Sequence, residues 1–336
     1  MDAITTAYMA RTRVAPWIGI GAKGQWDDYH EALHAGGLDF TVYPQGVYWD
    51  KPDGITLDEI YSSPDPNAWS GYPSYEEDVD LVANVRGDTN RLLGVVTPRY
   101  KIVQNERAFK IMEQVIAAGG IITNAGMTEQ GLCFMVARMS RLSIDGDMYE
   151  MNVMVTNSFN GAFPLALIIT PVRIICQNMY RGLMGQADNV VRMRHETNVV
   201  DRLDVQYDIM GRMNSYCVDF NAKVLKLVDA PMKAGDYQRL LEMLFPYPKP
   251  GGAREQTSIA RIESMREEFT RDYYNVADNM HYVGTAFGFF NAYMDWLSHA
   301  GNTKRTAGSW QDKRLSKLVS GDLIKHNVIS ECMKLA

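Results

Sequence analysis

Residues 30–34 read HEALH, which matches the HExxH pattern of zinc hydrolases. In that pattern two histidines one helical turn apart, here His30 and His34, bind Zn²⁺, and Glu31 would act as the general base. The segment runs directly into two glycines, and Phe40 stands where the extended pattern would have its third histidine. Because most matches to so short a motif are accidental, zinc hydrolysis is an alternative hypothesis and not the leading one.

A second group of candidates consists of basic residues that stand beside aromatic residues or turns. Basic side chains neutralise phosphates and aromatic rings stack on unpaired bases, which is the chemistry of sequence-tolerant binding to single strands. Two of the arginines follow a predicted hairpin and are expected near one edge of a binding groove, although Arg173 could instead form a buried ion pair. The candidates are Arg99, Tyr100, Lys101, Arg138, Arg141, Arg173, Tyr180, Arg181, Arg192 and Arg194.

The charge of the chain is unevenly distributed. The net charge of −6 excludes a generally basic nucleic-acid binder. Residues 1–90 contain 5 Lys/Arg against 15 Asp/Glu, a balance of −10, whereas residues 91–200 contain 11 against 8, a balance of +3. Residues 201–336 are nearly neutral, with 18 against 17. The middle third is therefore the expected site of contact with an anionic partner.

Composition limits the class of protein. No stretch is long and apolar enough for a membrane span, and the first residues lack the apolar core of a signal peptide, so a cytoplasmic protein is expected. The four cysteines stand far apart and are expected to be free thiols, most of them buried. The chain contains no nucleophile elbow, phosphate-binding loop or dinucleotide fingerprint. We therefore expect no enzyme activity and no cofactor.

Hydrophobic periodicity predicts an α+β fold, with a central, mostly antiparallel sheet and covering helices. Residues 1–79 are predicted to form an irregular acidic region with one short helix at 26–35. Residues 80–198 are predicted to form the α+β core, and residues 199–336 a helical region. Within the core, strands are expected at 81–86, 92–97, 121–125, 132–139 and 165–169, a hairpin at 142–149, and a helix at 105–118 in a βαβ-like unit. The helical region is expected to contain helices at 203–227, 259–276 and 282–299, with a loop at 245–252.

Several fragments, in order and at suitable spacing, resemble the phage/plasmid-like family of unknown function, domain of unknown function 932. They are PWIG at 16–19, EAL at 31–33, GLDF at 37–40, VQN at 103–105, TNS at 156–158, TPVR at 170–173, CQN at 176–178, RH at 194–195, GT at 284–285 and NA at 291–292. The resemblance rests on Glu-Ala-Leu and Gly-Leu-Asp and not on the two histidines of HEALH. It implies a role in the DNA metabolism of a mobile element within a bacterial host cell. In outline, the sheet and helices are also similar to single-strand annealing proteins of the RecT and Redβ kind.

The leading hypothesis is therefore a non-enzymatic protein that binds single-stranded DNA through its central sheet and promotes annealing or recombination. A homo-oligomer is expected. The alternatives are the zinc hydrolase and an interaction protein, such as a host-defence antagonist, whose acidic region binds a basic partner.

Overall fold

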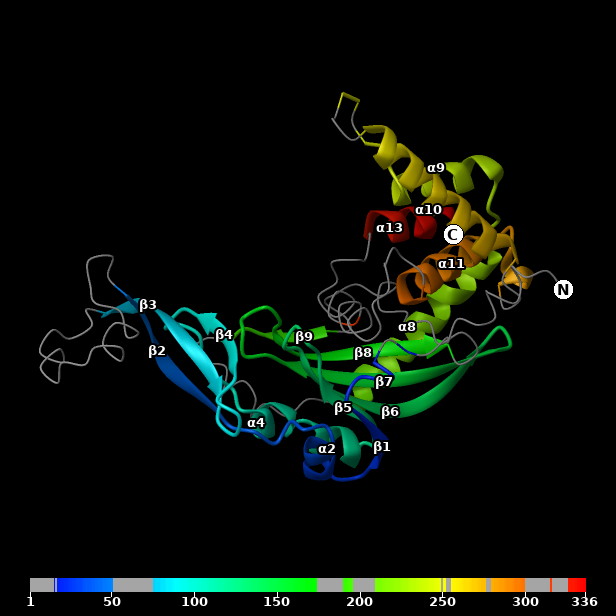
Figure 1. Ribbon diagram of the computed structural model, residues 1–336. Helices are drawn as coiled ribbons and strands as arrows, with labels where there is room; N and C mark the ends of the chain where they lie inside the picture. Colours follow the sequence, from blue (N-terminus) through cyan, green and yellow to red (C-terminus); the bar gives the residue numbers. More distant parts are fainter. Residues whose placement is uncertain are drawn as a thin grey trace, which may run out of the picture.

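The computed structural model describes residues 15, 17–50, 75–173, 190–195, 209–248, 250–251, 255–275, 279–299, 315 and 326–336. Figure 1 shows a central sheet, a smaller sheet on one side of it and a group of helices on the other. The fold is of the α+β class, as the sequence predicts.

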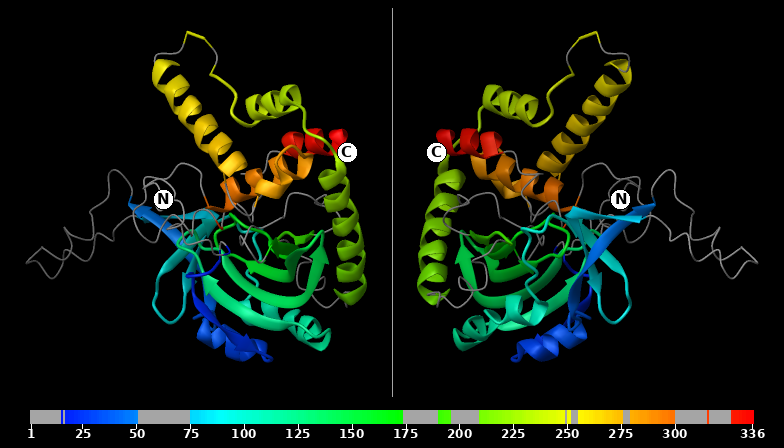
Figure 2. Two further views of the ribbon diagram at one scale, coloured as in Figure 1. Left: turned by 90° about the vertical axis from the view of Figure 1, so that its right-hand side faces the viewer. Right: turned by 90° about the vertical axis from the view of Figure 1, so that its left-hand side faces the viewer.

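The central sheet has six antiparallel strands in the order β1-β5-β6-β7-β8-β9. The two longest strands are joined by a tight turn in which Asp145 and Gly146 have positive φ angles of 49° and 82°, the conformation that a two-residue hairpin loop requires. Figure 2 shows that the sheet is strongly curved. Its strands are β1 (Ala22–Trp26), β5 (Ile121–Met127), β6 (Cys133–Ile144), β7 (Asp147–Asn157), β8 (Leu165–Arg173) and β9 (Val190–Met193).

Two strands of this sheet are longer than the sequence predicts. The expected hairpin at 142–149 is the far end of β6 joined to the start of β7, so β6 is continuous. The Thr170-Pro171 pair predicts a break after the strand at 165–169, and this prediction is wrong, because Pro171 lies inside β8 opposite Met151. β9 pairs only with residues 165–168 of β8. Pro171 therefore lies beyond the part of β8 that hydrogen-bonds to β9, where the missing N–H of proline is tolerated.

A second sheet of three antiparallel strands, which we call the arm, projects from the six-stranded sheet (Figure 1). It consists of β2 (Val42–Asp50), β3 (Tyr75–Arg86) and β4 (Leu92–Val96). The prediction of an irregular region before residue 80, apart from its one short helix, is therefore wrong for residues 22–26, 42–50 and 75–79, which form strands. The expected βαβ-like unit is also wrong, because β4 and β5 belong to different sheets.

Short helices and one long helix pack on the same face of the six-stranded sheet. Gly36, which ends α2, approaches Ala125 of β5 so closely that a Cβ atom on it would lie 2.8 Å from the Ala125 Cβ. Phe220 of α8 packs edge-on against Tyr149 of β7, with 5.4 Å between the ring centroids. Figure 2 shows α8 along one side of the curved sheet. The helices near the sheet are α2 (Tyr29–Ala35), α4 (Asn105–Phe109), α5 (Met112–Ala117) and α8 (Ile209–Asp229).

The remaining helices form a layer around α11, whose phenylalanine and tyrosine side chains are buried. Tyr282 joins this layer to the sheet, because its hydroxyl donates a 2.8 Å hydrogen bond to Asp147 at the β6–β7 hairpin. The helices are α9 (Ala234–Leu244), α10 (Glu255–Asn275), η2 (Met280–Tyr282), α11 (Ala286–His299) and α13 (His326–Leu335). In the described ranges no helix combines the length and apolar character needed to cross a membrane.

Candidate nucleic-acid interface

Two of the predicted arginines come together because of a bulge in β6. In a regular strand residues 138 and 141 would point to opposite faces, since side chains alternate. Between Arg138 and Ser140 the register shifts by one residue, so Arg138 lies opposite Asn152 and Arg141 lies opposite Glu150. Both arginines therefore project from the face of the sheet that α2 and α8 do not cover. We call this the arginine face.

Glu150, which the sequence did not single out, lies between these two arginines. Its Oε1 atom is 3.8 Å from Nη1 of Arg138 and 3.6 Å from Nη2 of Arg141. The side chains are 30%, 60% and 28% exposed for Arg138, Arg141 and Glu150, so water screens both ion pairs. One carboxylate shared by two guanidinium groups leaves a net positive charge and hydrogen-bonding capacity for an anion.

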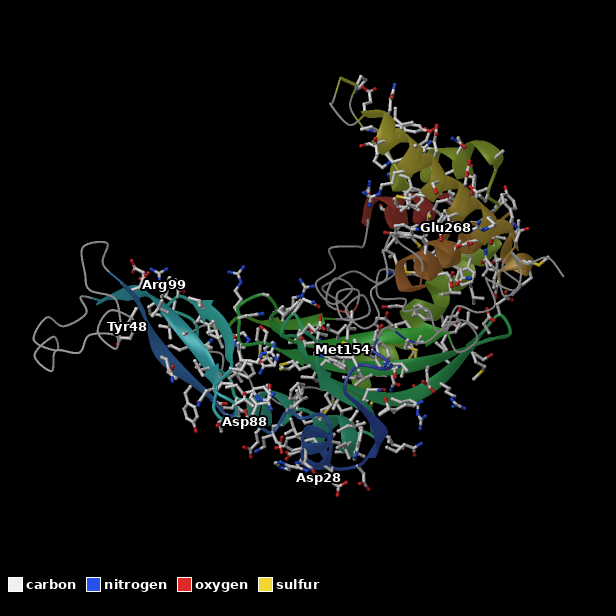
Figure 3. The ribbon with its side chains drawn as sticks, in the orientation of Figure 1. Asp28, Tyr48, Asp88, Arg99, Met154 and Glu268 are labelled. Carbon is white, nitrogen blue, oxygen red and sulfur yellow. The ribbon has the colours of Figure 1, made fainter. Side chains whose placement is uncertain are left out.

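The register places a third candidate on the arginine face. Arg192 of β9 lies opposite Ala166 of β8, which lies opposite Thr156 of β7. Directly opposed residues of antiparallel strands point to the same side, so Arg192 lies on the same face as Thr156. Thr156 is six residues from Glu150 along β7, an even number, so Glu150 lies on that face too. At a rise of about 3.4 Å per residue, those two rows are separated by ~20 Å along the strands. The arginines thus mark opposite ends of one sheet face, whose centre at Met154 is buried (Figure 3).

The arginine face also carries buried polar side chains between the arginines. Asn152 lies between Arg138 and Thr170 in one row across three strands. Among the described residues, none makes a hydrogen bond with the buried Thr170 hydroxyl or with the buried Nδ2 atom of Asn124. Buried polar groups are usually satisfied, so these two atoms indicate a face that is not simply a hydrophobic layer.

A contact between two distant segments brings two more cations, Lys101 and Arg194, to the end of the face where Arg192 lies. The Lys101 N–H donates to the His195 carbonyl oxygen over 2.9 Å, and Nδ1 of His195 lies 3.1 Å from the Lys101 carbonyl oxygen. This brings Lys101 beside Arg194 and, through β9, beside Arg192. All three side chains are exposed, and we call them the edge cluster. Arg99 lies in the turn that follows β4, two residues before Lys101 (Figure 3).

Tyr100 packs and hydrogen-bonds within the folded protein in this region. Its ring stacks on His195 with 4.6 Å between the centroids, and its hydroxyl donates a 2.6 Å hydrogen bond to the Ser158 carbonyl oxygen. Burial raises the pKa of Tyr100, with the hydrogen bond to Ser158 acting in the opposite direction. One face of the ring is therefore occupied, and the geometry gives little support to the predicted role of Tyr100 as a platform for bases.

His195 should make folding stability dependent on pH. Burial lowers its pKa below the ordinary 6.5, and the hydrogen bond to the Lys101 carbonyl oxygen only partly offsets this. Well above pH 6.5 the ring is neutral in the folded and in the unfolded chain. As the pH falls below 6.5 towards the lower pKa of the folded protein, the unfolded chain takes up the proton more readily than the folded protein does, and folding stability is lost. Urea-unfolding midpoints should therefore decrease between pH 7.5 and 5, and less steeply in His195→Phe. Asn214→Ala, an exposed change on α8 that alters no titratable group, is the control that should leave the slope unchanged.

The remaining predicted residues fall outside this geometry. Arg173 ends β8 opposite Tyr149, but its side chain lies outside the described residues, as do Tyr180 and Arg181 entirely. The segment around Cys176-Gln177-Asn178, whose sequence predicts the start of a short helix, also lies outside them. Cys133 and Cys332 are buried and Cys217 is partly buried, and all three are free thiols.

His30, Glu31 and His34 of the HEALH motif are exposed on α2, whereas Ala32 and Leu33 are buried. His34 Nδ1 is 2.7 Å from Oδ2 of Asp39, and this hydrogen bond lowers the pKa of Asp39. In the part of the chain that the structure describes, no group of three or more His, Cys, Asp or Glu side chains is placed to hold a metal ion. The geometry there gives the zinc alternative no support.

The fragments that carry the family resemblance meet in a buried hydrogen-bond network. Nδ2 of Asn157 donates to the Val103 carbonyl oxygen over 2.9 Å and to Oδ1 of Asn105 over 3.0 Å. Asn105 in turn donates to the Leu38 carbonyl oxygen over 3.0 Å, and the Gln104 amide bonds both backbone groups of Val42. These residues join the sheet, the arm and α4. Their geometry is that of a scaffold and not of a reactive site.

The model of one protein family, described as Domain of unknown function (DUF932), matches residues 92–319. Neither the curated proteins nor the solved structures include a match to this chain. The similarity to RecT and Redβ proteins has no support from these comparisons.

Proposed function

The chain belongs to the DUF932 family, whose function is unknown, and we propose from the geometry that it binds single-stranded DNA on the arginine face of its six-stranded sheet. Arg138 and Arg141 contact phosphates at one end of that face, and Arg192 with the rest of the edge cluster contacts them at the other. Binding needs no cofactor and no chemical step. Strand annealing would be a further step, which a separate assay with complementary strands would test.

The observation that carries the proposal is the β6 bulge. A regular strand would place only one of Arg138 and Arg141 on this face, whereas the bulge places both there, beside a single carboxylate. Bulges re-aim side chains and are frequent beside functional sites. A purely structural ion pair would need only one arginine for Glu150.

The shape of the surface favours a single strand over a duplex. Duplex DNA is usually read by a helix or a two-stranded ribbon that enters the major groove. Here the exposed cations lie at two ends of one sheet face, ~20 Å apart, and a flexible phosphate backbone can bend to reach both ends more readily than a stiff duplex can.

Single strands are therefore expected to bind more tightly than duplex of the same sequence, measured by fluorescence anisotropy with a labelled oligonucleotide. Affinity should fall as salt rises, because each contacted phosphate of a single strand contributes about −0.7 to the slope of log K against log salt. For the five cations of the arginine face and edge cluster, the slope should be about −3.5. Absence of binding to either form at low salt would contradict the proposal.

A further inference from the structure

Two exposed histidines on α2 are not used by the proposed interface. His30 and His34 are four residues apart in the helix, so they project from the same face, with about 5–6 Å between their Cβ atoms. Ala32 and Leu33 are buried and hold the other face of the helix against the core. Because α2 packs on the side of the six-stranded sheet opposite to the arginine face, the two histidines are separate from the residues that we assign to DNA binding.

The turn that ends α2 places a carboxylate against one of these histidines. The Leu38 N–H donates to the Leu33 carbonyl oxygen over 2.9 Å, and the Gly37 N–H donates to the His34 carbonyl oxygen over 3.0 Å. These two bonds define a Schellman turn, and the φ of 62° at Gly37 is the conformation that such a turn requires. The chain thereby folds back over the last turn of the helix, and Oδ2 of Asp39 lies 2.7 Å from Nδ1 of His34.

The backbone is anchored on both sides of Asp39. Leu38, the residue before it, is fully buried, and its carbonyl oxygen accepts a 3.0 Å hydrogen bond from Nδ2 of Asn105. Phe40, the residue after it, is also buried, and its ring centroid lies 5.8 Å from that of Phe159. The carboxylate is therefore presented to His34 by a fixed segment of the chain.

The hydrogen bond at Nδ1 of His34 determines what the other ring nitrogen can do. When Nδ1 carries the hydrogen that the Asp39 carboxylate accepts, Nε2 of the neutral ring holds the lone pair. Metal-binding histidines almost always have such a partner on their second nitrogen, because it fixes the orientation of the ring and raises its basicity. The His34 side chain is 83% exposed, so a solvated ion can reach it.

We propose that His30 and His34 chelate a divalent transition-metal ion such as Zn²⁺, and that Asp39 is the positioning residue of His34. Imidazole nitrogen is a preferred ligand of Zn²⁺, Ni²⁺ and Cu²⁺, whereas Mg²⁺ prefers oxygen. The exposed carboxylates of Asp28 and Glu31 add negative charge that favours a cation.

This site differs from that of a zinc hydrolase. A catalytic zinc has three protein ligands, and the described residues provide no group of three or more metal-binding side chains. In the proposed site water completes the coordination of the ion, and no chemical step follows. Binding is expected to be weaker than at a structural zinc site, where four protein ligands surround the metal.

The test is calorimetric titration of the metal-free full chain with Zn²⁺. The wild type should bind Zn²⁺ and should not bind Mg²⁺. His30→Ala and His34→Ala should each weaken Zn²⁺ binding at least about tenfold, because the second imidazole of a chelate binds intramolecularly. His281→Ala is the matched control and should bind like the wild type. His281 is also exposed and its ring also contacts that of a neighbouring tyrosine, but the sequence has no histidine one helical turn away from it.

Asp39 is tested by a graded pair of variants. Asp39→Ala should weaken Zn²⁺ binding roughly tenfold, and Asp39→Asn, which keeps an acceptor oxygen for Nδ1 of His34, should weaken it less. Without metal, all variants should melt close to the wild type, because the replaced side chains are exposed. Zn²⁺ should raise the melting temperature of the wild type but not that of either α2 histidine variant, because the ion binds the folded helix.

A wild type that does not bind Zn²⁺, or that binds Mg²⁺ equally well, would overturn the proposal. Binding that survives the loss of either His30 or His34 would overturn it too. An Asp39→Ala variant with wild-type affinity would overturn the role of Asp39. Because these measurements contain no nucleic acid, their failure leaves DNA binding to be judged separately, and failure of DNA binding leaves them unaffected.

Discussion

Replacing Arg138 and Arg141 together by alanine is expected to weaken binding to single-stranded DNA roughly 100-fold at low salt, because each lost charge-assisted contact contributes about 1.5 kcal/mol. The slope of log K against log salt should also become shallower by about 1.4, because each phosphate contact on a single strand contributes about 0.7 and two are lost. The loss should be similar for oligonucleotides of different sequence, since phosphate contacts carry no sequence information. Anisotropy titrations at several salt concentrations measure both quantities.

A substitution of the shared carboxylate of Glu150 is expected to change the affinity for single-stranded DNA in the opposite direction. Glu150→Gln keeps the size of the side chain but removes a negative charge beside both arginines, so affinity should increase. Lys226→Ala, on the exposed side of α8, is the control for a simple loss of positive charge. All variants should keep their melting temperature, since exposed ion pairs contribute little to stability. If the double arginine variant folds normally and binds like the wild type, the interface lies elsewhere.

Asn157→Ala is expected to lower the free energy of unfolding by about 2–4 kcal/mol, because it leaves two buried acceptors, the Val103 carbonyl oxygen and Oδ1 of Asn105, without their donor. Asn157 is 0% exposed, so water cannot replace the lost amide. Urea denaturation monitored by tryptophan fluorescence measures the change as a shift of the midpoint at constant slope.

Asn214, exposed on α8, supplies the matched control, and its replacement by alanine should change stability by less than about 0.5 kcal/mol. A normally stable Asn157→Ala protein that no longer binds DNA would assign Asn157 to the interface and not to the scaffold. That outcome would also reassign the family motif residues from folding to function.

Local patterns were sufficient to predict much of the sheet. The alternation in 81–86 and 92–97, the Asp145-Gly146 turn and the apolar segment 165–169 each correspond to observed strands, because alternation and turn chemistry act over a few residues. Which strands share a sheet depends on pairings between distant residues, and so the separate sheets of β4 and β5 could not be predicted. β2 was missed because Pro44 and the nearby glycines resemble a loop, whereas in the structure Pro44 lies at the unpaired edge of the arm.

The candidate interface was predicted only in part. The sequence identified Arg138, Arg141 and Arg192 as basic residues near strands, but their common face follows from a bulge and from the register of four strands. No local pattern identifies a bulge of this kind, and Glu150 has no distinctive neighbour in the sequence. Tyr100 was predicted to stack on bases, yet it stacks on His195, 95 residues later, a contact that only the tertiary fold creates.

The most direct test of the central claim is photo-crosslinking of a 4-thiothymidine-containing single strand to the full chain, with the crosslinked peptides identified by mass spectrometry. Binding on the arginine face predicts crosslinks in peptides from β6, β7 and residues 190–195, and their loss when an excess of unlabelled single strand is added. Crosslinks confined to α8, α9 or α10, or crosslinks that survive the competitor, would contradict binding on this face.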